Sequence, residues 1–522
     1  MQRAAGRAAW PLALGAGVLQ AFSIAAPWNG QPLWWLQLLS LAVPAGLLSA
    51  QTSALRGALI GWVFATAWLA STWWWLFISM HVYGGLAAPL AVAAVLALAG
   101  FLALYYAAVS GLFVATRRMG TAWAAINFGA LWLAAELARG VWFTGFPWGA
   151  GGYAHVEGPL AALAPWVGVY GIGFVAAVLA AVVSLLVGAG GRRLLRVWVP
   201  AAVAGVVVVV ANAVPAAAIA PAGAPFSVAL LQGNIPQDEK FESGSGVPLA
   251  LGWYASQLEA ATATLVVAPE TAIPLLPAQL PDDYLPQVSQ RYRAPGSTQA
   301  MLVGIPLGNL AEGYSNSVIG IRAGGETQAV YRYDKHHLVP FGEFIPPLFK
   351  WFVRLMNIPL GDFNVAPLVQ PSFEVAGQRL APNICYEDLF GEELGARFTD
   401  AATAPTAFVN VSNIGWFGNT VAIDQHLQIS RMRTLEFARP MIRATNTGAT
   451  VVIDAQGRVT HALPRYTRGV LVGEAQGMSG LTPFARWVSV LGLWPLWLLG
   501  ALGVVAAAYA MRTSRPGRAA VT

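Results

Sequence analysis

Long apolar runs constrain this chain more than any other feature. Eight stretches are long enough to cross the roughly 30 Å hydrocarbon layer of a bilayer as helices. Seven lie before residue 225 and one after residue 480, at about 9–26, 33–50, 57–78, 88–114, 121–138, 163–188, 197–219 and 487–510. Arg3 and Arg7 precede the first run as in a signal peptide, but no convincing small-residue cleavage site follows, so we expect a retained helix.

Charge divides the chain at the same places. The mean hydropathy is +0.57, and 10% of the residues are charged, whereas about 25% is usual in soluble proteins. Residues 226–480 nevertheless hold 39 of the 54 charged side chains. We therefore predict a membrane domain at 1–225 with seven helices, a water-exposed domain at 226–480, and an eighth helix with a tail at 481–522.

The arginines predict the orientation of the helices, because loops rich in Lys and Arg stay in the cytoplasm. Eleven arginines lie at the N-terminus, in alternate loops and in the C-terminal tail. The intervening loops hold only Arg139, which we expect to pair with Glu136 three residues earlier. This pattern predicts cytoplasmic termini and places residues 226–480 on the far side. It also accounts for the pI of about 9.5 without a nucleic-acid partner.

The water-exposed part has the pattern of an α/β domain. Stretches rich in β-branched and aromatic residues predict strands at 226–232, 264–268, 300–305, 317–321, 329–333, 380–385, 406–411, 440–445 and 450–454. Helical stretches lie between them at 246–260, 282–292 and 422–437, the last with apolar residues at helical spacing.

Three short motifs end predicted strands and carry reactive side chains. They are VVAPETAIP with Glu270, YRYDKHHLVPFGEF with Lys335, and APNICYEDLF with Cys385. Side chains just past the carboxyl ends of strands meet at one rim of an α/β fold. A carboxylate, an ammonium and a thiol gathered there would form a base, an oxyanion stabiliser and a nucleophile that carries an acyl group as a thioester.

Each of these residues has a commoner explanation when it is taken alone. A lone cysteine is usually a small buried apolar side chain, and a Glu or Lys after a strand is usually solvated. Cys385, however, is the only cysteine, and Lys335 is one of three lysines. Their order at three strand ends favours a nucleophilic site. His336 and His337 lack further ligands at metal-binding spacing, so we expect neither a metal nor a cofactor.

These motifs resemble the Glu-Lys-Cys triad of the nitrilase superfamily. With seven helices before them and one after, the chain is similar to bacterial apolipoprotein N-acyltransferases over nearly its full length. Further matches are FTGFPW (143–148), QGNIPQ (232–237), LVPFGEF (338–344), ICYED (384–388) and SNIGWFG (412–418).

The resemblance implies an αββα sandwich at 226–480, on the periplasmic side of the bacterial inner membrane. It implies that Cys385 takes a fatty acyl chain from a phospholipid, chiefly phosphatidylethanolamine. The chain then passes to the α-amine of the diacylglyceryl cysteine of an apolipoprotein. In that reaction Glu270 would be the general base and Lys335 the oxyanion stabiliser.

Residues outside the triad also match the family. Glu343, Tyr386 and Glu387 stand at positions that the family treats as essential. We expect Glu343 to hold or tune the triad and Glu387 to support the cysteine loop. Where the family often has a tryptophan after QGNIPQ, the nearest aromatic residue here is Phe241, which is a further candidate for lipid contact.

A membrane-facing lid is expected at 346–358, PPLFKWFVRLMNI, where Trp351 and Phe352 would contact lipid. Ordinary packing of a helix is the alternative for this segment. Trp416 and Phe417 are a second candidate pair for the same lipid surface.

Rival functions fit the motifs less well. A membrane-tethered amidase that hydrolyses a small C–N bond could use the same triad, because only the nucleophile that clears the thioester differs. A transporter would require ionisable residues inside its helices, and these are nearly absent. A receptor with an inactive fold is disfavoured because all three triad positions are intact.

Overall fold

The computed structural model describes residues 2–116, 121–187, 202, 205–206, 209–309, 311–323, 330–346 and 362–513. The chain forms two compact units. The first comprises residues 1–74, 92–216 and 493–522, and the second comprises 75–91 and 217–492. The short segment 75–91 thus belongs to the second unit, although the residues on either side of it belong to the first.

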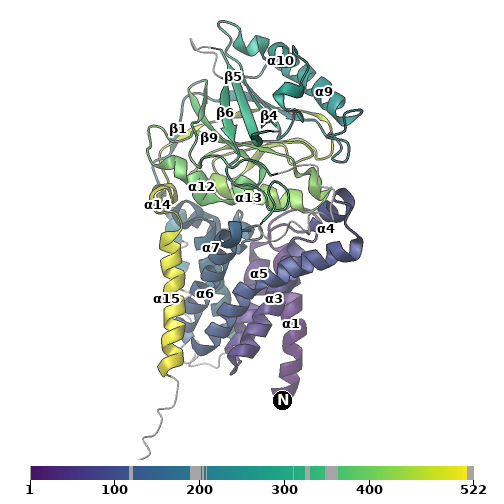
Figure 1. Cartoon of the computed structure of the whole chain (residues 1–522). Coiled ribbons are helices and arrows are strands. Elements are labelled where there is room, and N and C mark those ends of the chain that lie inside the picture. Colours follow the sequence, from purple (N-terminus) through teal and green to yellow (C-terminus); the bar gives the residue numbers. More distant parts are fainter. Residues whose placement is uncertain are drawn as a thin grey trace, which may run out of the picture. The chain divides into compact units, whose positions relative to one another are not determined.

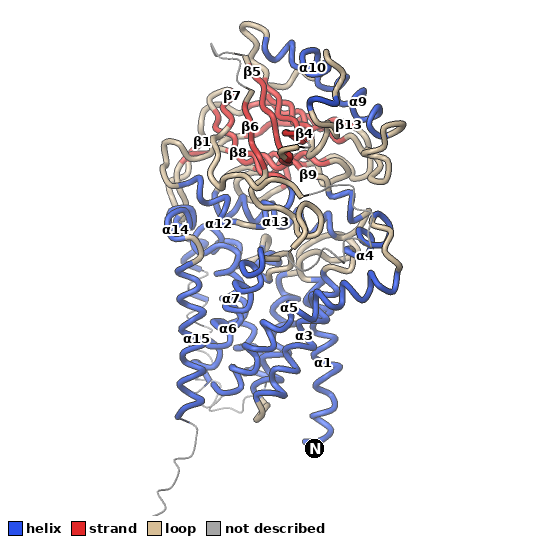
Figure 2. Tube along the Cα trace, in the orientation of Figure 1, coloured by secondary structure: helices blue, strands red, loops and turns tan. Residues whose placement is uncertain are grey.

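Helices form the first unit (Figures 1 and 2). They are α1 (Gln2–Phe22), α2 (Trp34–Ser49), α3 (Ala54–Thr72), most of α5 (Ala88–Thr116), α6 (Thr121–Val141), α7 (Ala164–Val187) and α15 (Trp494–Thr513). Large apolar side chains such as Leu12, Leu96 and Leu502 are more than half exposed. An apolar helix surface of this kind suits lipid and not water.

Membrane crossing is supported by length and composition. Among the described residues, the helices that are long and apolar enough to cross a membrane are Ala54–Thr72, Ala88–Ala115, Pro159–Leu186 and Trp494–Arg512. Two shorter helices are also apolar, Ala8–Phe22 and Trp34–Ser49. The expected span at 197–219 is described only in part, because residues 197–201, 203–204 and 207–208 lie outside the described residues. The expected span at 57–78 was too long, because α3 already ends at Thr72.

The expected ion pair between Glu136 and Arg139 is not formed. No contact within 4.0 Å joins their charged atoms. The Arg139 guanidinium instead donates to the carbonyl oxygens of Phe146 and Trp148, the latter at 3.0 Å. Glu136 Oε1 accepts the backbone N–H of Gly151 at 2.8 Å. Both side chains therefore bind the backbone of the loop after α6, which contains the FTGFPW motif.

Two six-stranded sheets form the centre of the second unit (Figure 2). The first sheet has the order β13 (Gly469–Ala475), β2 (Phe226–Gln232), β3 (Leu265–Ala268), β4 (Ala300–Asn309), β5 (Gly313–Arg322) and β6 (Tyr331–Asp334). The second has the order β12 (Val459–Ala462), β11 (Val451–Ile453), β10 (Met441–Thr445), β9 (Ala407–Ser412), β8 (Gln378–Ile384) and β7 (Phe373–Val375). Strands β1 (Ala220–Pro221) and β14 (Met478–Ser479) form a separate pair.

Helices cover the outer face of each sheet (Figure 1). A core of side chains such as Val228, Val267, Ile384 and Val409 fills the space between the sheets. A second core joins the first sheet to α9 (Gly246–Ala260) and α10 (Tyr284–Arg293). A third joins the second sheet to α12 (Gly391–Gly395), α13 (Ala422–Phe437) and α14 (Pro483–Leu491). The predicted αββα sandwich is confirmed.

The central strands are apolar because both of their faces are covered. All four residues of β3 and all six of β9 are buried. Parallel pairing of β2, β3 and β4 in one sheet, and of β8, β9 and β10 in the other, brings several carboxyl ends to the same edge of each sheet. Polar side chains that follow these strands are therefore gathered in one place.

Candidate active site

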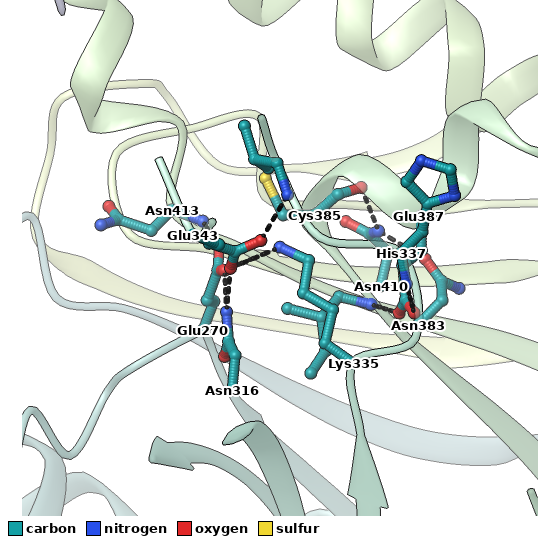
Figure 3. Close-up of polar contacts among 12 residues, drawn as sticks. Glu270, Asn316, Lys335, His337, Glu343, Asn383, Cys385, Glu387, Asn410 and Asn413 are labelled. Carbon is teal, nitrogen blue, oxygen red and sulfur yellow. Dashed lines mark hydrogen bonds and ion pairs between the residues drawn. The ribbon is translucent and has the colours of Figure 1, made fainter. Parts of the chain in front are cut away.

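Strand ends bring the three predicted residues together. Glu270 follows β3 by two residues, Lys335 directly follows β6, and Cys385 directly follows β8 in the opposite sheet. Figure 3 shows the side chains of Glu270 and Lys335 pointing toward one another, with Cys385 at the edge of the same cluster. Both sheets thus contribute to one site, as the motif positions predict.

Lys335 lies between two carboxylates. Its Nζ is 2.8 Å from Oε1 of Glu343 and 3.5 Å from Oε1 of Glu270, and its side chain is 1% exposed. Asn316 Nδ2 donates to both of these oxygens at 2.7 Å. The second oxygen of Glu270 accepts the backbone N–H of Asn413 at 2.8 Å. These contacts fix Glu270 and Lys335 in one geometry.

This cluster stabilises the charged forms of its members. Burial raises the pKa of Glu270, but Lys335, Asn316 and the other donors outweigh burial and hold that pKa below its usual value. Burial likewise lowers the pKa of Lys335, but Glu343 and Glu270 outweigh it and raise that pKa. At neutral pH the site therefore holds a carboxylate beside an ammonium.

The backbone at Cys385 is strained. Its φ of 51° lies in the left-handed region, which residues other than glycine rarely adopt. The Cys385 carbonyl oxygen accepts hydrogen bonds from His426 Nε2 at 3.2 Å and from Asn410 Nδ2 at 3.4 Å. Such strain persists only where the surrounding contacts enforce it, and it is typical of functional sites.

The Cys385 thiol is neutral at rest. Burial, together with the negative charge of Glu270, raises the pKa of the thiol to about 12, although Lys335 acts in the opposite direction. A thiol of this kind becomes a nucleophile only when a base removes its proton. Glu270, whose negative charge acts on the same thiol, is the candidate for that base.

Glu387 joins the segment that follows Lys335, the lysine loop, to the turn at residues 385–389 that carries Cys385, the cysteine loop. One carboxylate oxygen accepts the backbone N–H groups of His336 and His337, at 2.7 and 3.3 Å. The other accepts the N–H of Ile384 and the hydroxyl of Tyr333, at 2.7 and 2.8 Å. This buried carboxylate therefore sets the spacing between the residues next to Lys335 and those next to Cys385.

Tyr386 directly follows Cys385 in the cysteine loop. Its side chain is buried, and its ring lies 5.6 Å from the ring of His337 and 5.2 Å from that of Phe390. His337 in turn stacks on Phe390 at 3.6 Å. Tyr386 thus packs against His337, which follows Lys335, and against Phe390, which follows the turn that carries Cys385.

Sequence reasoning missed a buried polar network beneath Cys385. His426 Nδ1 accepts a hydrogen bond from Arg443, so its Nε2–H donates to Asp388 at 2.8 Å and to the Cys385 carbonyl. Arg443 also donates to Asp388 and Asn410 at 3.2 and 3.1 Å. The available signal was a histidine and an arginine placed among the apolar residues of a helix and a strand.

The expected lipid-contact residues fall into two groups. Trp351 and Phe352 lie outside the described residues. Trp416 and Phe417 are half-buried in the turn 414–417, where Phe417 lies 4.2 Å from Trp75 and Trp416 lies 5.8 Å from Tyr83 between ring centres. Phe241 is also half-buried, with its ring 5.9 Å from Lys240 Nζ.

A glycine in β4 leaves room for the turn that holds Glu270. A Cβ at Gly304 would lie 2.3 Å from the Pro269 carbonyl oxygen and 2.7 Å from the Glu270 Cα. Gly304→Ala should therefore displace Glu270, lower the free energy of unfolding by about 1–3 kcal/mol, and reduce activity by about 10²-fold. Chemical denaturation and a rate assay would measure both effects.

Gly252→Ala is the matched control, because a Cβ there meets nothing within 4 Å. This helical substitution should raise the free energy of unfolding by up to about 1 kcal/mol and leave the rate unchanged. Wild-type activity in Gly304→Ala would contradict the close approach at Glu270.

Two family models match the chain. The apolipoprotein N-acyltransferase N-terminal domain matches residues 16–182, and the carbon-nitrogen hydrolase model matches residues 227–483. A carbon-nitrogen hydrolase from Helicobacter pylori G27 aligns structurally with a TM-score of 0.35 and 14% identity, over 52% of this chain and 94% of that one.

Relatives match over almost their full length. The apolipoprotein N-acyltransferase of Verminephrobacter eiseniae is 59% identical over 517 residues, which cover 94% of this chain and 95% of the relative. That of Ralstonia nicotianae is 48% identical over 505 residues, covering 95% of this chain and 93% of the relative. Because these relatives are 59% and 48% identical over almost the whole chain, the chain belongs to the apolipoprotein N-acyltransferase family.

Proposed function

We propose that this protein transfers a fatty acyl chain from a phospholipid to the N-terminal amine of a diacylated apolipoprotein through a thioester on Cys385. The observation that carries this proposal is the ionised Glu270–Lys335 pair beside a neutral, strained cysteine. The relatives' name supplies the class of acceptor. The donor is proposed to be chiefly phosphatidylethanolamine.

The first half-reaction forms the thioester. Glu270 takes the proton of the Cys385 thiol as the sulfur attacks the ester carbonyl carbon of the phospholipid. Negative charge develops on the carbonyl oxygen, and Lys335 stabilises it with an N–H that its two carboxylate partners do not accept. The C–O bond then breaks, and Glu270 returns the proton to the lysophospholipid oxygen.

The second half-reaction passes the acyl chain to the amine. The amine nitrogen attacks the thioester carbonyl, the C–N bond forms, and Lys335 again stabilises the oxyanion. Glu270 takes a proton from the nitrogen and gives it to the sulfur as the C–S bond breaks. The amide leaves, and the neutral thiol is restored.

Lipid substrates explain why the enzyme has apolar helices. Transfer of a ~16-carbon chain from lipid to water costs more than about 10 kcal/mol, at about 0.8 kcal/mol for each CH₂. We propose eight membrane helices in the bacterial inner membrane, with cytoplasmic termini and a periplasmic catalytic domain. The proposed domains are 1–225, 226–480 and 481–522.

A lid for the lipid is proposed at 346–358, with Trp351 and Phe352 as its lipid-contacting side chains. Trp416 and Phe417 are proposed as the fixed part of the same surface. The half-buried state of Trp416 and Phe417 leaves some of their area available for a lipid chain.

An amidase that hydrolyses a small C–N bond is the alternative function. Its triad would be the same, because water would replace the amine as the second nucleophile. The family model matched over residues 16–182 favours acyl transfer instead, since a small soluble substrate does not require the apolar helices of this region.

The test is a transfer assay with purified protein in detergent. The donor is phosphatidylethanolamine with an isotopically labelled acyl chain, and the acceptor is a diacylated lipopeptide with a free α-amine. We expect the peptide to gain one labelled acyl group, whereas an otherwise identical N-acetylated peptide gains none. Release of labelled fatty acid without acylation of the peptide would identify a hydrolase.

A further inference from the structure

Lys240 is a buried lysine that the proposed mechanism does not use. It is 2% exposed and lies between β2 and α9, in the segment that follows QGNIPQ. Its Nζ donates to the backbone carbonyl oxygen of Glu270 at 3.1 Å. A second amine therefore lies directly beside the residue that serves as the base.

Hydrogen bonds to the residues that precede Lys240 hold its segment in this position. Asn446 bonds both backbone groups of Ile235, at 3.0 and 2.9 Å. Gln237 Oε1 accepts from the Asn413 side chain at 2.9 Å, and the backbone N–H of that same asparagine binds Glu270. The segment that carries Lys240 is thus anchored to the same residues that fix the catalytic carboxylate.

The two buried lysines of the site have opposite surroundings. Lys335 contacts two carboxylates. Lys240 contacts a backbone carbonyl, and among the described residues no carboxylate oxygen lies within 4.0 Å of its nitrogen. A buried cation without a close counter-ion is costly, so its neutral form is favoured. Environments that separate paired titratable groups in this way often mark distinct acid and base roles.

The titration of Lys240 agrees with its surroundings. Burial lowers the pKa of Lys240 to about 7, although the negative charge of Glu270 acts in the opposite direction. The other titratable side chain of the site that faces it is the Cys385 thiol, which is neutral at rest. At neutral pH Lys240 therefore exists partly as a free amine that can accept a proton.

The acceptor of the second half-reaction presents a problem that Glu270 is poorly suited to solve. An α-amine has a pKa of about 7.7–8.0, so it arrives mostly as an ammonium without a lone pair. Glu270 has a pKa below the usual carboxylate value and takes this proton unfavourably. An amine with a pKa near that of the acceptor is a better match.

We propose that Lys240 removes the first proton from the acceptor's ammonium group, an inference that rests on the proposed acyl transfer. The proton moves from the acceptor nitrogen to Lys240 Nζ, and the freed lone pair attacks the thioester carbon. Glu270 then takes the second proton from the nitrogen and delivers it to the Cys385 sulfur as the C–S bond breaks. Lys240 releases its proton to water, and the atoms and charges balance.

The experiment measures the two half-reactions separately in the Lys240→Met variant and in the wild type. Thioester is first formed from phosphatidylethanolamine alone, and its decay is then followed with one of two acceptors. The diacylated lipopeptide arrives as an ammonium, whereas hydroxylamine is already neutral at neutral pH. We expect acylation and hydroxylamine clearance within about threefold of wild type, and transfer to the lipopeptide slower by about 10²-fold.

The pH profile provides a second readout. Transfer to the lipopeptide by the wild type should rise as pH increases through about 7, where Lys240 loses its proton, whereas in Lys240→Met the rise should shift to about pH 8, where the acceptor's own α-amine loses its proton. Lys240→Arg keeps a charge but cannot act as a base, so it should resemble Lys240→Met. Arg322→Met is the surface control, because that side chain is 46% exposed.

Three outcomes would overturn the inference. Equal slowing with both acceptors would indicate a structural role for Lys240, and unchanged transfer to the lipopeptide would indicate no role. Loss of acylation in Lys240→Met would place the residue in the first half-reaction instead. Absence of any thioester in the wild type would be a separate result that refutes the proposed acyl transfer itself.

Discussion

Cys385→Ala should reduce acyl transfer by about 10⁵-fold, the scale of loss when a covalent nucleophile is removed. The reaction then lacks the atom that holds the acyl chain between donor and acceptor. Lys335 and Glu270 remain in place, but the carboxylate has no thiol to deprotonate. A radiolabelled transfer assay with detergent-purified protein would measure the residual rate.

The folded structure should survive this substitution. The hydrogen bonds from His426 and Asn410 hold the backbone carbonyl of residue 385 and not its side chain. Cys385→Ala should therefore unfold at nearly the wild-type temperature, and so should Cys385→Ser, whose hydroxyl is a much weaker nucleophile. A residual rate above about one hundredth of wild type in either variant would exclude Cys385 as the nucleophile.

Glu270→Gln is expected to slow thioester formation by about 10³-fold, within the 10²–10⁴ range for loss of a general base. The loss has two causes. The amide cannot accept the thiol proton, and both oxygens of Glu270 now accept hydrogen bonds, from Asn316 and from the Asn413 backbone. The NH₂ of glutamine would have to face one of these donors. Single-turnover acylation with phospholipid in excess would measure the effect.

Glu374→Gln is the matched control for this change, because the Glu374 side chain is 63% exposed. It should acylate at the wild-type rate. Since the pKa of Glu270 lies below its usual value and that of the thiol is raised to about 12, wild-type acylation should be nearly constant between about pH 5 and 9. A rise in acylation near pH 8 would instead indicate that the free thiolate is the reacting species.

The central part of the site could be predicted because strand ends are readable in the sequence. Stretches rich in β-branched and aromatic residues predict β3, β6 and β8, and each of these strands is followed within two residues by a reactive side chain. The packing of the two sheets in the αββα sandwich then brings these strand ends together. Glu343 and Glu387 could be given supporting roles by resemblance, whereas their actual partners, such as Val339 N–H for Glu343, required the structure.

Asn316 has no local signal, and the signal of His426, a histidine among the apolar residues of a helix, does not reveal its partners. Asn316 lies inside β5 and is 46 positions from Glu270 in the sequence, so only the pairing of β4 with β5 brings it to the carboxylate. His426 stands alone in α13 and acquires its role from contacts with Cys385, Asp388 and Arg443. Such roles depend on tertiary packing, which composition and periodicity do not encode.

The structure of residues 75–91 also could not be predicted from the sequence. Their apolar start resembles a continuation of α3, yet α3 ends at Thr72 and a π-helical turn follows at Ser79–Tyr83. The Trp75 indole N–H donates to Gln425 Oε1 at 3.0 Å, and its ring packs on Phe417. A buried indole N–H usually has a hydrogen-bond partner, and the partner of Trp75 lies 350 residues away in the sequence.

The most direct test of the central claim is the intact mass of the protein after incubation with phospholipid in the absence of an acceptor. We predict that the wild type gains the mass of one long-chain acyl group, that peptide mapping places it on Cys385, and that hydroxylamine removes it. Cys385→Ala should gain nothing under the same conditions. A wild-type protein that turns over phospholipid without this adduct, or an adduct that persists in Cys385→Ala, would contradict the thioester mechanism.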